Sequence, residues 1–146
     1  MIVGRGMLAQ AFSAFKNEAE IMIFASGVSD SQEVRESEFE REKNLLLSTI
    51  KMHSAATFVY FSTCSMHDPM AADTAYVKHK LAMEEIIKKL CANYYIFRVS
   101  QIVGWTKNHK TLTNFLINKI NDGIPFEVWE MSTRNLIDIE DLQKIV

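Results

Sequence analysis

Residues 57–65 read TFVYFSTCS, and residues 74–80 read TAYVKHK. The first run opens with β-branched and aromatic residues over strand length and then changes to small polar side chains. The second run leads into residues 81–90, whose apolar residues recur at helical spacing. Tyr76 and Lys80 are four residues apart, so a helix places them on one face. The stretch predicts a strand that ends in hydroxyls, followed by a helix with a phenol and an amine near its start.

These side chains are suited to proton transfer. An ammonium held near a phenol stabilises the phenolate and lowers the phenol pKa, and a hydroxyl such as Thr63 can hydrogen-bond the same substrate oxygen. The residue types alone also allow a plain interpretation, in which Tyr76 starts a helix and Lys80 solvates its face.

Length and composition limit the classes of protein. The 146 residues fit one compact domain, residues 1–146, and the net charge of -2 gives no basic field for binding nucleic acid. Cys64 and Cys91 form neither a C-x-x-C motif nor a disulfide framework, which is typical of a reducing compartment. The sequence has no apolar run of membrane-spanning length and no signal-peptide layout. We therefore expect a cytoplasmic protein with neither a nucleic-acid nor a membrane partner.

A glycine pattern lies near the N-terminus. Gly4-x-Gly6-x-x-Ala9 follows the short apolar run Met1–Val3, and residues 7–15 then have helical spacing. In this pattern the first glycine permits a tight turn, the second lets the backbone approach a pyrophosphate, and a small third residue allows close helix packing. An ordinary glycine turn between a strand and a helix is the alternative.

These features, with RVSQIVG at residues 98–104, resemble the short-chain dehydrogenase/reductase family. The resemblance is to its extended branch of NAD(P)-dependent nucleotide-sugar epimerases, dehydratases and reductases. It implies a three-layer α/β, Rossmann-like parallel sheet. It also implies that Tyr76 is the general acid/base, that Lys80 lowers its pKa and holds the nicotinamide ribose, and that Thr63 is the hydroxyl partner.

The resemblance also implies a site for NAD or NADP. Arg5 could meet the 2'-phosphate of NADP through its planar guanidinium, or could simply lie on the surface. Ser26 and Gly27 lie in a loop that touches the cofactor in relatives, although composition alone equally allows a plain turn. The expected cofactor-binding residues are Gly4, Arg5, Gly6, Met7, Leu8, Ser26, Gly27 and Lys80.

The chain departs from the family between the first two strands. Residues 20–25 are already strand-like, only a few residues after the first helix, so the second and third strands of a complete Rossmann fold have no room. We therefore expect a sheet that lacks those two strands, with strands starting at Met1, Ile21, Phe58 and Tyr94 in that spatial order. The first strand should lie at an edge of the sheet.

The rest of the chain yields further expectations. Amphipathic helices over 33–53 and 76–90 should lie on one side of the sheet, and relatives pair these helices in a homodimer, which we also expect here. The remaining elements are expected as a buried strand over 94–99, a polar loop over 107–110, a helix over 111–121, a strand over 124–129, and a short strand followed by a helix that opens at Asp141.

Other reactive side chains give weaker signals. Cys64 beside Thr63 could be a nucleophile, but it shares no motif with a histidine and a small buried thiol is commoner. His67 lies where sugar-modifying relatives often have a substrate-facing tyrosine, and a solvated loop histidine is at least as consistent. The four histidines share no metal-ligand spacing, so no metal site is expected: they are His53, His67, His79 and His109.

Two functions follow from these observations. The first is an NAD(P)-dependent epimerase, dehydratase or reductase acting on a nucleotide sugar. The second is a degenerate, non-catalytic relative that serves as a binding or assembly module. The second is suggested by the missing strands, by the early end of the chain and by Glu38, which stands where related enzymes usually carry an asparagine that supports the lysine through water.

Overall fold

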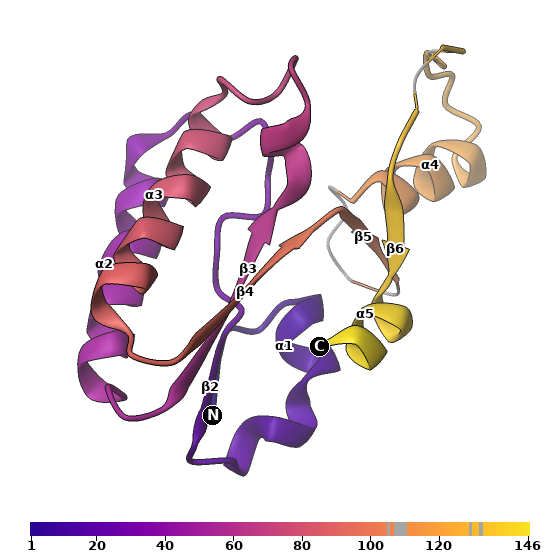
Figure 1. Ribbon diagram of the computed structural model, residues 1–146. Helices are drawn as coiled ribbons and strands as arrows, with labels where there is room; N and C mark the ends of the chain where they lie inside the picture. Colours follow the sequence, from indigo (N-terminus) through magenta and orange to yellow (C-terminus); the bar gives the residue numbers. More distant parts are fainter. Residues whose placement is uncertain (105, 107–110, 129, 132) are drawn as a thin grey trace.

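A four-stranded parallel sheet forms the centre of the protein (Figure 1). The computed structural model describes residues 1–104, 106, 111–128, 130–131 and 133–146. The spatial order of the strands is β1-β2-β3-β4, which confirms the expected order. As expected, the sequence between β1 and β2 forms no further strand. The elements are β1 (Ile2–Val3), α1 (Met7–Ala11), η1 (Ser13–Asn17), β2 (Ile21–Phe24), α2 (Glu36–Met52), β3 (Thr57–Thr63), η2 (Cys64–His67), α3 (Ala75–Leu90), β4 (Tyr94–Val99), β5 (Gln101–Val103), α4 (Leu112–Asn121), β6 (Leu136–Asp138) and α5 (Ile139–Ile145).

The central strand β3 is buried on both faces because helices cover the sheet from both sides. Phe58 and Tyr60 point to the side of α2 and α3, where they pack with Leu46 and Ile87. On the other side, α1 and α5 cover the strand and add Phe12 and Leu142 to a second apolar cluster. The arrangement is the predicted three-layer α/β fold, with α2 and α3 together on one face (Figure 1).

A partly buried ion pair joins α3 to the outer strand β4. Both oxygens of the Glu84 carboxylate accept hydrogen bonds from the Arg98 guanidinium, at 3.0 and 2.7 Å. Glu84 is fully buried, and this pairing with Arg98 compensates for its removal from water. The pair fixes α3, and with it the side chains at its N-terminal end, against the edge of the sheet.

The C-terminal segment packs on α1 through a glycine. Gly104 has a φ of 157°, and a Cβ there would lie 2.6 Å from Cγ2 of Ile139 and 3.2 Å from Sδ of Met7. Only glycine fits so close a contact. The small parallel pair β5–β6, next to Gly104, is a separate sheet, with Ile102 opposite Ile137.

Several expectations for the periphery were wrong. Residues 124–128 form no strand, and Trp129, like residues 107–110, lies outside the described residues. β4 has no buried residue, and half of its residues are exposed, because it is an outer strand. The first helix ends at Ala11 and continues as a 3-10 turn, and α5 opens at Ile139 rather than at Asp141. Among the described residues no helix has the length and apolar character needed to cross a membrane.

Candidate active site

The ends of three neighbouring strands place the predicted residues at one edge of the sheet. Because β1, β2 and β3 are parallel, their carboxyl ends lie at the same edge. Gly4 follows β1, Ser26 and Gly27 follow β2 closely, and Thr63 is the last residue of β3. Gly4 directly contacts the β2 end, since a Cβ on Gly4 would overlap the carbonyl group of Ala25. The first glycine turn and the loop after β2 therefore lie against each other.

Tyr76 and Lys80 lie on the first turns of α3, which begins after Thr74. The Thr74 hydroxyl accepts a hydrogen bond from the Val77 N–H at 3.3 Å and so caps the helix. The four-residue spacing brings the Lys80 ammonium to 5.9 Å from the centre of the Tyr76 ring. Tyr76 is half-buried and Lys80 is 4% exposed. The helix thus directs both groups toward the end of β3.

The Lys80 ammonium bonds to groups other than Tyr76. Its Nζ donates to Oε1 of Glu42 at 3.2 Å and to the Tyr60 hydroxyl at 3.1 Å. Gly27 packs against the ammonium, since a Cβ at Gly27 would lie 2.5 Å from Nζ. The lysine therefore connects the loop after β2 with α2 and β3.

Glu42 is a fully buried carboxylate within this contact. Its Oε1 also accepts from the Tyr60 hydroxyl at 2.7 Å, and its Oε2 accepts from the Val28 N–H at 2.6 Å and lies 3.0 Å from Nε2 of His79. Burial alone raises the pKa of the Glu42 carboxyl, but His79, Lys80, Val28 and Tyr60 together bring it down to about 2. The carboxylate is therefore ionised at neutral pH, and burial and this charge raise the pKa of Tyr60 well above its ordinary value.

The phenol of Tyr76 differs from the expectation for it. Burial, followed by the negative charge of Glu42, raises its pKa to about 12, while a hydrogen bond with Thr63 acts in the opposite direction. The expected lowering of the Tyr76 pKa by Lys80 is not found: burial has the largest effect on the pKa of the phenol, and the Lys80 ammonium bonds to Glu42 and Tyr60 instead. Tyr76 is consequently a protonated phenol at neutral pH, next to the hydroxyl of Thr63.

The remaining predicted residues occupy the rim of the site. Arg5 and Gly6 are exposed, whereas Met7, Leu8 and Ser26 are half-buried. The Thr63 hydroxyl, at the end of β3, contacts Ser65: it donates to Oγ of Ser65 at 3.0 Å and accepts from the Ser65 N–H at 3.1 Å. Cys64 is half-buried beside a cavity of about 280 Å³ that Arg98 and Asn135 also line. His67 is exposed, and the described residues contain no group of three or more His, Cys, Asp or Glu side chains able to hold a metal ion.

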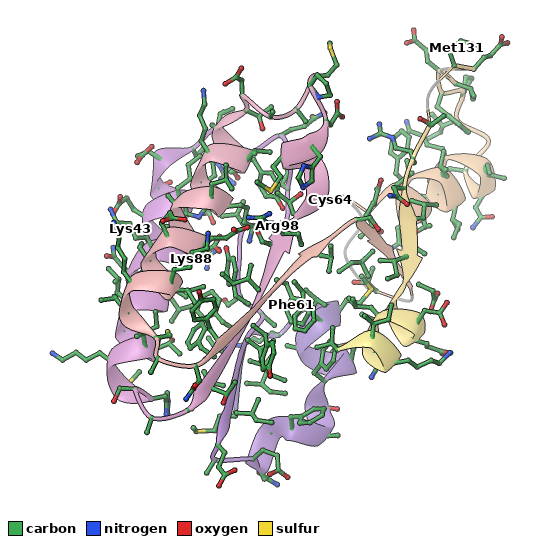
Figure 2. The ribbon with its side chains drawn as sticks, viewed as in Figure 1. Lys43, Phe61, Cys64, Lys88, Arg98 and Met131 are labelled. Atoms are coloured by element: carbon green, nitrogen blue, oxygen red, sulfur yellow. The ribbon has the colours of Figure 1, made fainter. Side chains whose placement is uncertain are left out.

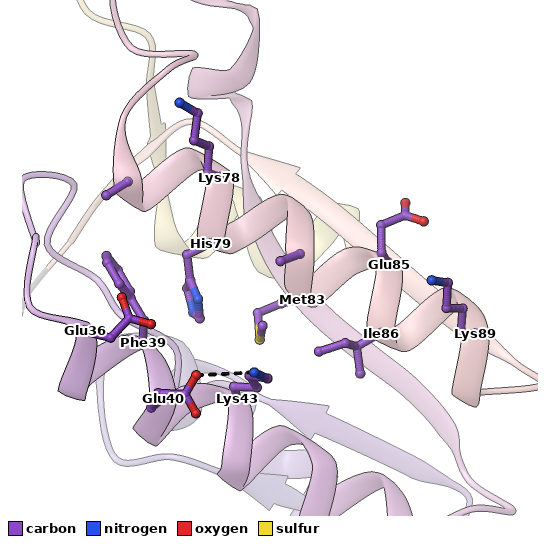
Figure 3. A pocket seen from close by; sticks show the side chains of 12 residues that line it. Glu36, Phe39, Glu40, Lys43, Lys78, His79, Met83, Glu85, Ile86 and Lys89 are labelled. Carbon is purple, nitrogen blue, oxygen red and sulfur yellow. Dashed lines mark hydrogen bonds and ion pairs between the residues drawn. The ribbon is translucent and has the colours of Figure 1, made fainter.

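A second hollow, of about 540 Å³, lies on a different face of α3 from Tyr76 and Lys80. It runs between α2 and α3 and is lined by the Phe39 ring, which stacks on His79 at 4.7 Å, and by charged side chains such as Glu40 and Lys43 (Figure 3). The hollow lies away from Thr63 and the glycine turn. The pairing of these two helices with a second copy of the chain stays a prediction.

Sequence reasoning missed Glu42, Tyr60 and His79. A signal was present: Glu42 interrupts the apolar stripe of α2, falling three residues after Phe39 and four before Leu46. A carboxylate at such a position has to find a partner inside the protein. Which partner it finds depends on how α2 packs on α3, and the sequence does not give that register.

The close packing of Gly27 leads to a prediction. Gly27→Ala is expected to displace the Lys80 ammonium, because the new methyl group would lie 2.5 Å from Nζ and 3.0 Å from Oε1 of Glu42. We expect the free energy of unfolding to fall by about 1–3 kcal/mol, as for other overpacking substitutions. Urea denaturation measures the change, with Ser29→Ala on the exposed part of the same loop as the control. Equal stabilities of the two variants would contradict the packing described here.

Comparison with known proteins gives a consistent result. A model of the NAD dependent epimerase/dehydratase family matches residues 8–146. No protein with a curated description matches the sequence. Among solved structures, a dTDP-4-dehydrorhamnose reductase from Clostridium acetobutylicum ATCC 824 is similar, with a TM-score of 0.65 and 18% identity over 94% of this chain and 54% of that one. The capsular polysaccharide assembling protein CapF from Staphylococcus aureus is similar with a TM-score of 0.60 and 16% identity, over 94% of this chain and 37% of that one.

These likenesses differ in what they establish. At such low identity the two solved structures show the fold alone, and this chain spans only about half of the first and little more than a third of the second. The family model, in contrast, matches nearly the whole chain, from the helix after the glycine turn to the last residue. The chain therefore belongs to the NAD dependent epimerase/dehydratase family.

Proposed function

We propose that this chain is an NAD(P)-dependent enzyme that modifies a nucleotide sugar by epimerisation, dehydration or reduction. The observation that carries the proposal is the meeting of a phenol, an amine and a hydroxyl at the carboxyl edge of the sheet: Tyr76, Lys80 and Thr63. Family membership supports the cofactor, and the solved reductase and capsule protein support the class of substrate.

The residues at the glycine turn fit the dinucleotide. A Cβ at Gly6 would have no described atom within 4 Å, so the backbone is open on the side from which a pyrophosphate would approach. Gly4, Arg5, Gly6, Met7 and Leu8 would hold the phosphates, Ser26 and Gly27 would face the middle of the cofactor, and Lys80 would hold the nicotinamide ribose. The nicotinamide would supply the hydride acceptor or donor.

The state of the phenol favours a particular use. The Tyr76 phenol carries its proton at neutral pH, so it would act as a proton donor to a substrate oxygen, and its pKa of about 12 makes it a weaker acid than an ordinary tyrosine. The Thr63 hydroxyl, at the end of β3, would bond to the same oxygen and fix its position. This arrangement suits protonation of a carbonyl oxygen as the carbonyl is reduced.

Cofactor binding is tested most directly by heat stability. At a hundredfold excess of NADH or NADPH over the dissociation constant, binding should stabilise the fold by about 2.7 kcal/mol and raise the melting temperature by about 5–10 °C. The double variant Lys80→Met/Glu42→Gln removes both charges together and should lose this response. A matched control, Lys89→Met/Glu85→Gln, changes the solvent-facing side of the same helix and should keep it.

The role of Tyr76 is tested separately. Tyr76→Phe should still be stabilised by NADH or NADPH. Its turnover of a nucleotide sugar that the wild type converts should fall by about 10²–10⁴-fold. Tyr95→Phe, on the exposed edge strand, is the control. If millimolar NADH and NADPH leave the melting temperature of the wild-type chain unchanged, the non-catalytic binding or assembly module becomes the better interpretation.

A further inference from the structure

Glu42 connects more parts of the site than the proposed chemistry requires. Its carboxylate bonds to the backbone of Val28 after β2, to Tyr60 on β3, and to His79 and Lys80 on α3. Through these contacts one buried side chain of α2 ties together the three segments that carry the candidate site. Side chains of α2, α3 and the sheet fill the space between these elements (Figure 2).

Packing alone does not account for a carboxylate at this position. The other buried positions of α2 carry no charge: they are Phe39, Leu46, Thr49 and Ile50. Burying an ion pair costs desolvation, and an apolar pair of similar volume is often as stable or more so. The contacts of Glu42 are instead directed at two parts of the site, Lys80 and the backbone that follows Gly27.

We propose that Glu42 is the positioning residue of the Tyr76–Lys80 pair: its carboxylate fixes the Lys80 ammonium beneath Gly27 and holds the loop at Ser26–Val28 against α3. This inference rests on the proposed function. Glu38, which stands at the expected place of the supporting asparagine, instead pairs with Arg41 at 3.1 Å. Support of the lysine thus comes from one turn further along α2.

The same carboxylate influences the protonation of both members of the pair. Burial lowers the pKa of Lys80, and the charge of Glu42 acts against this change and favours the ammonium. The groups that affect the Tyr76 phenol are Glu42 from α2, Cys64 from η2 and Thr63 from β3, and Glu42 favours the protonated phenol. Glu42 therefore favours the protonated form of both groups, the ammonium of Lys80 and the phenol of Tyr76.

The first test needs no cofactor. In Glu42→Gln, Lys80 loses its anionic partner. The neutral form of its amine becomes more favourable, and the side chain loses its ion pair with α2. Labelling with a small amine-reactive reagent, followed by mass spectrometry, should modify Lys80 about tenfold faster than in the wild type, while exposed Lys89 reacts at the same rate. In Glu40→Gln, which alters only a partly exposed ion pair of the same helix, both rates should stay unchanged.

Titration of the phenol separates an electrostatic role of Glu42 from a purely structural one, because only the electrostatic role changes the titration midpoint of Tyr76. Followed by ultraviolet absorbance, the midpoint for Tyr76 should fall in Glu42→Gln, because the nearby negative charge is gone, and should stay in place in Glu40→Gln. Subtracting the curve of the corresponding Tyr76→Phe variant isolates this residue. An unchanged Tyr76 midpoint, or an unchanged labelling rate of Lys80, would overturn the inference.

A conservative variant guards against a failure to fold. Glu42→Asp keeps the charge and shortens the side chain, so Lys80 should be labelled at a rate between those of the wild type and Glu42→Gln. In a cofactor titration by nicotinamide fluorescence, Glu42→Gln should weaken NADH binding about tenfold and Glu42→Asp should recover part of the loss. Equal affinity in all three proteins would count against the positioning role. Lack of NADH binding by the wild type would overturn the proposed function, while labelling and titration would still decide whether Glu42 holds the pair.

Discussion

Lys80→Ala is expected to lower the free energy of unfolding by about 3–5 kcal/mol. The ammonium of Lys80 lies 3.2 Å from Oε1 of Glu42, and both side chains are buried. Its removal leaves a charged carboxylate inside the protein without its cation, which costs far more than the loss of an exposed pair. Urea denaturation monitored by circular dichroism measures the change.

The control for this prediction lies on the same helix as Glu42. Lys43 pairs with Glu40 at 3.2 Å, but both side chains are more than 40% exposed. Lys43→Ala should therefore change the free energy of unfolding by no more than about 1 kcal/mol. If Lys80→Ala cost as little as Lys43→Ala, the Lys80–Glu42 contact would not be a buried ion pair.

The cost of Lys80→Ala should also depend on pH. In the folded protein the pKa of Glu42 is lowered from 4.5 to about 2, so its ionised form contributes stability above pH 4.5, and this contribution is lost as the pH falls toward 2. In the variant, protonation of Glu42 relieves the unpaired charge. The difference in stability between the two proteins should thus shrink as the pH is lowered through this range, and a difference that grows would contradict the assignment.

Gly4→Ala is expected to destabilise the fold by about 3 kcal/mol or more and to abolish the melting-temperature response to NADH. Gly4 has a φ of 137°, where residues other than glycine are strained, and the new Cβ would overlap the carbonyl group of Ala25. Relief of this overlap would push the glycine turn away from the end of β2. Thermal unfolding with and without cofactor measures both effects.

Gly6→Ala is the matched control for this change. A Cβ at Gly6 would have no described atom within 4 Å, so the stability of the variant should remain within about 1 kcal/mol of the wild type. Its cofactor response should nevertheless fall, because the methyl group would occupy the side open to the pyrophosphate. A large loss of stability in Gly6→Ala would show that the two glycines are constrained alike, contrary to the structure.

The order of the strands could be predicted because the resemblance to the family supplied it, while local signals showed where the strands lie in the sequence. The run of residues 57–63, the hydroxyls that end it and the short distance from β1 to β2 fix which strands exist and which are missing. The strand expected at 124–129 was wrong over 124–128 because a few apolar residues beside a proline resemble a strand even where no partner strand is available. Strand pairing is a property of the whole fold, which no local pattern contains.

The proximity of the candidate residues was predictable, but their electrostatics were not. The spacing of Tyr76 and Lys80 and the position of Thr63 follow from a helix and a strand, and the structure brings the three together. The pKa of Tyr76 depends instead on Glu42, which is 34 residues away in the chain and reaches the site through the packing of α2 on α3. Interactions of this kind follow from tertiary packing, which sequence periodicity does not specify.

The seating of Gly104 between Met7 and Ile139 has a mechanical consequence. Met7 directly follows Gly6, whereas Ile139 opens the last helix of the chain. A shift of that helix would therefore press on Gly104 and, through it, on the Met7 side chain beside the glycine turn. Events at the two ends of this polypeptide are felt together, although nearly the entire sequence separates them.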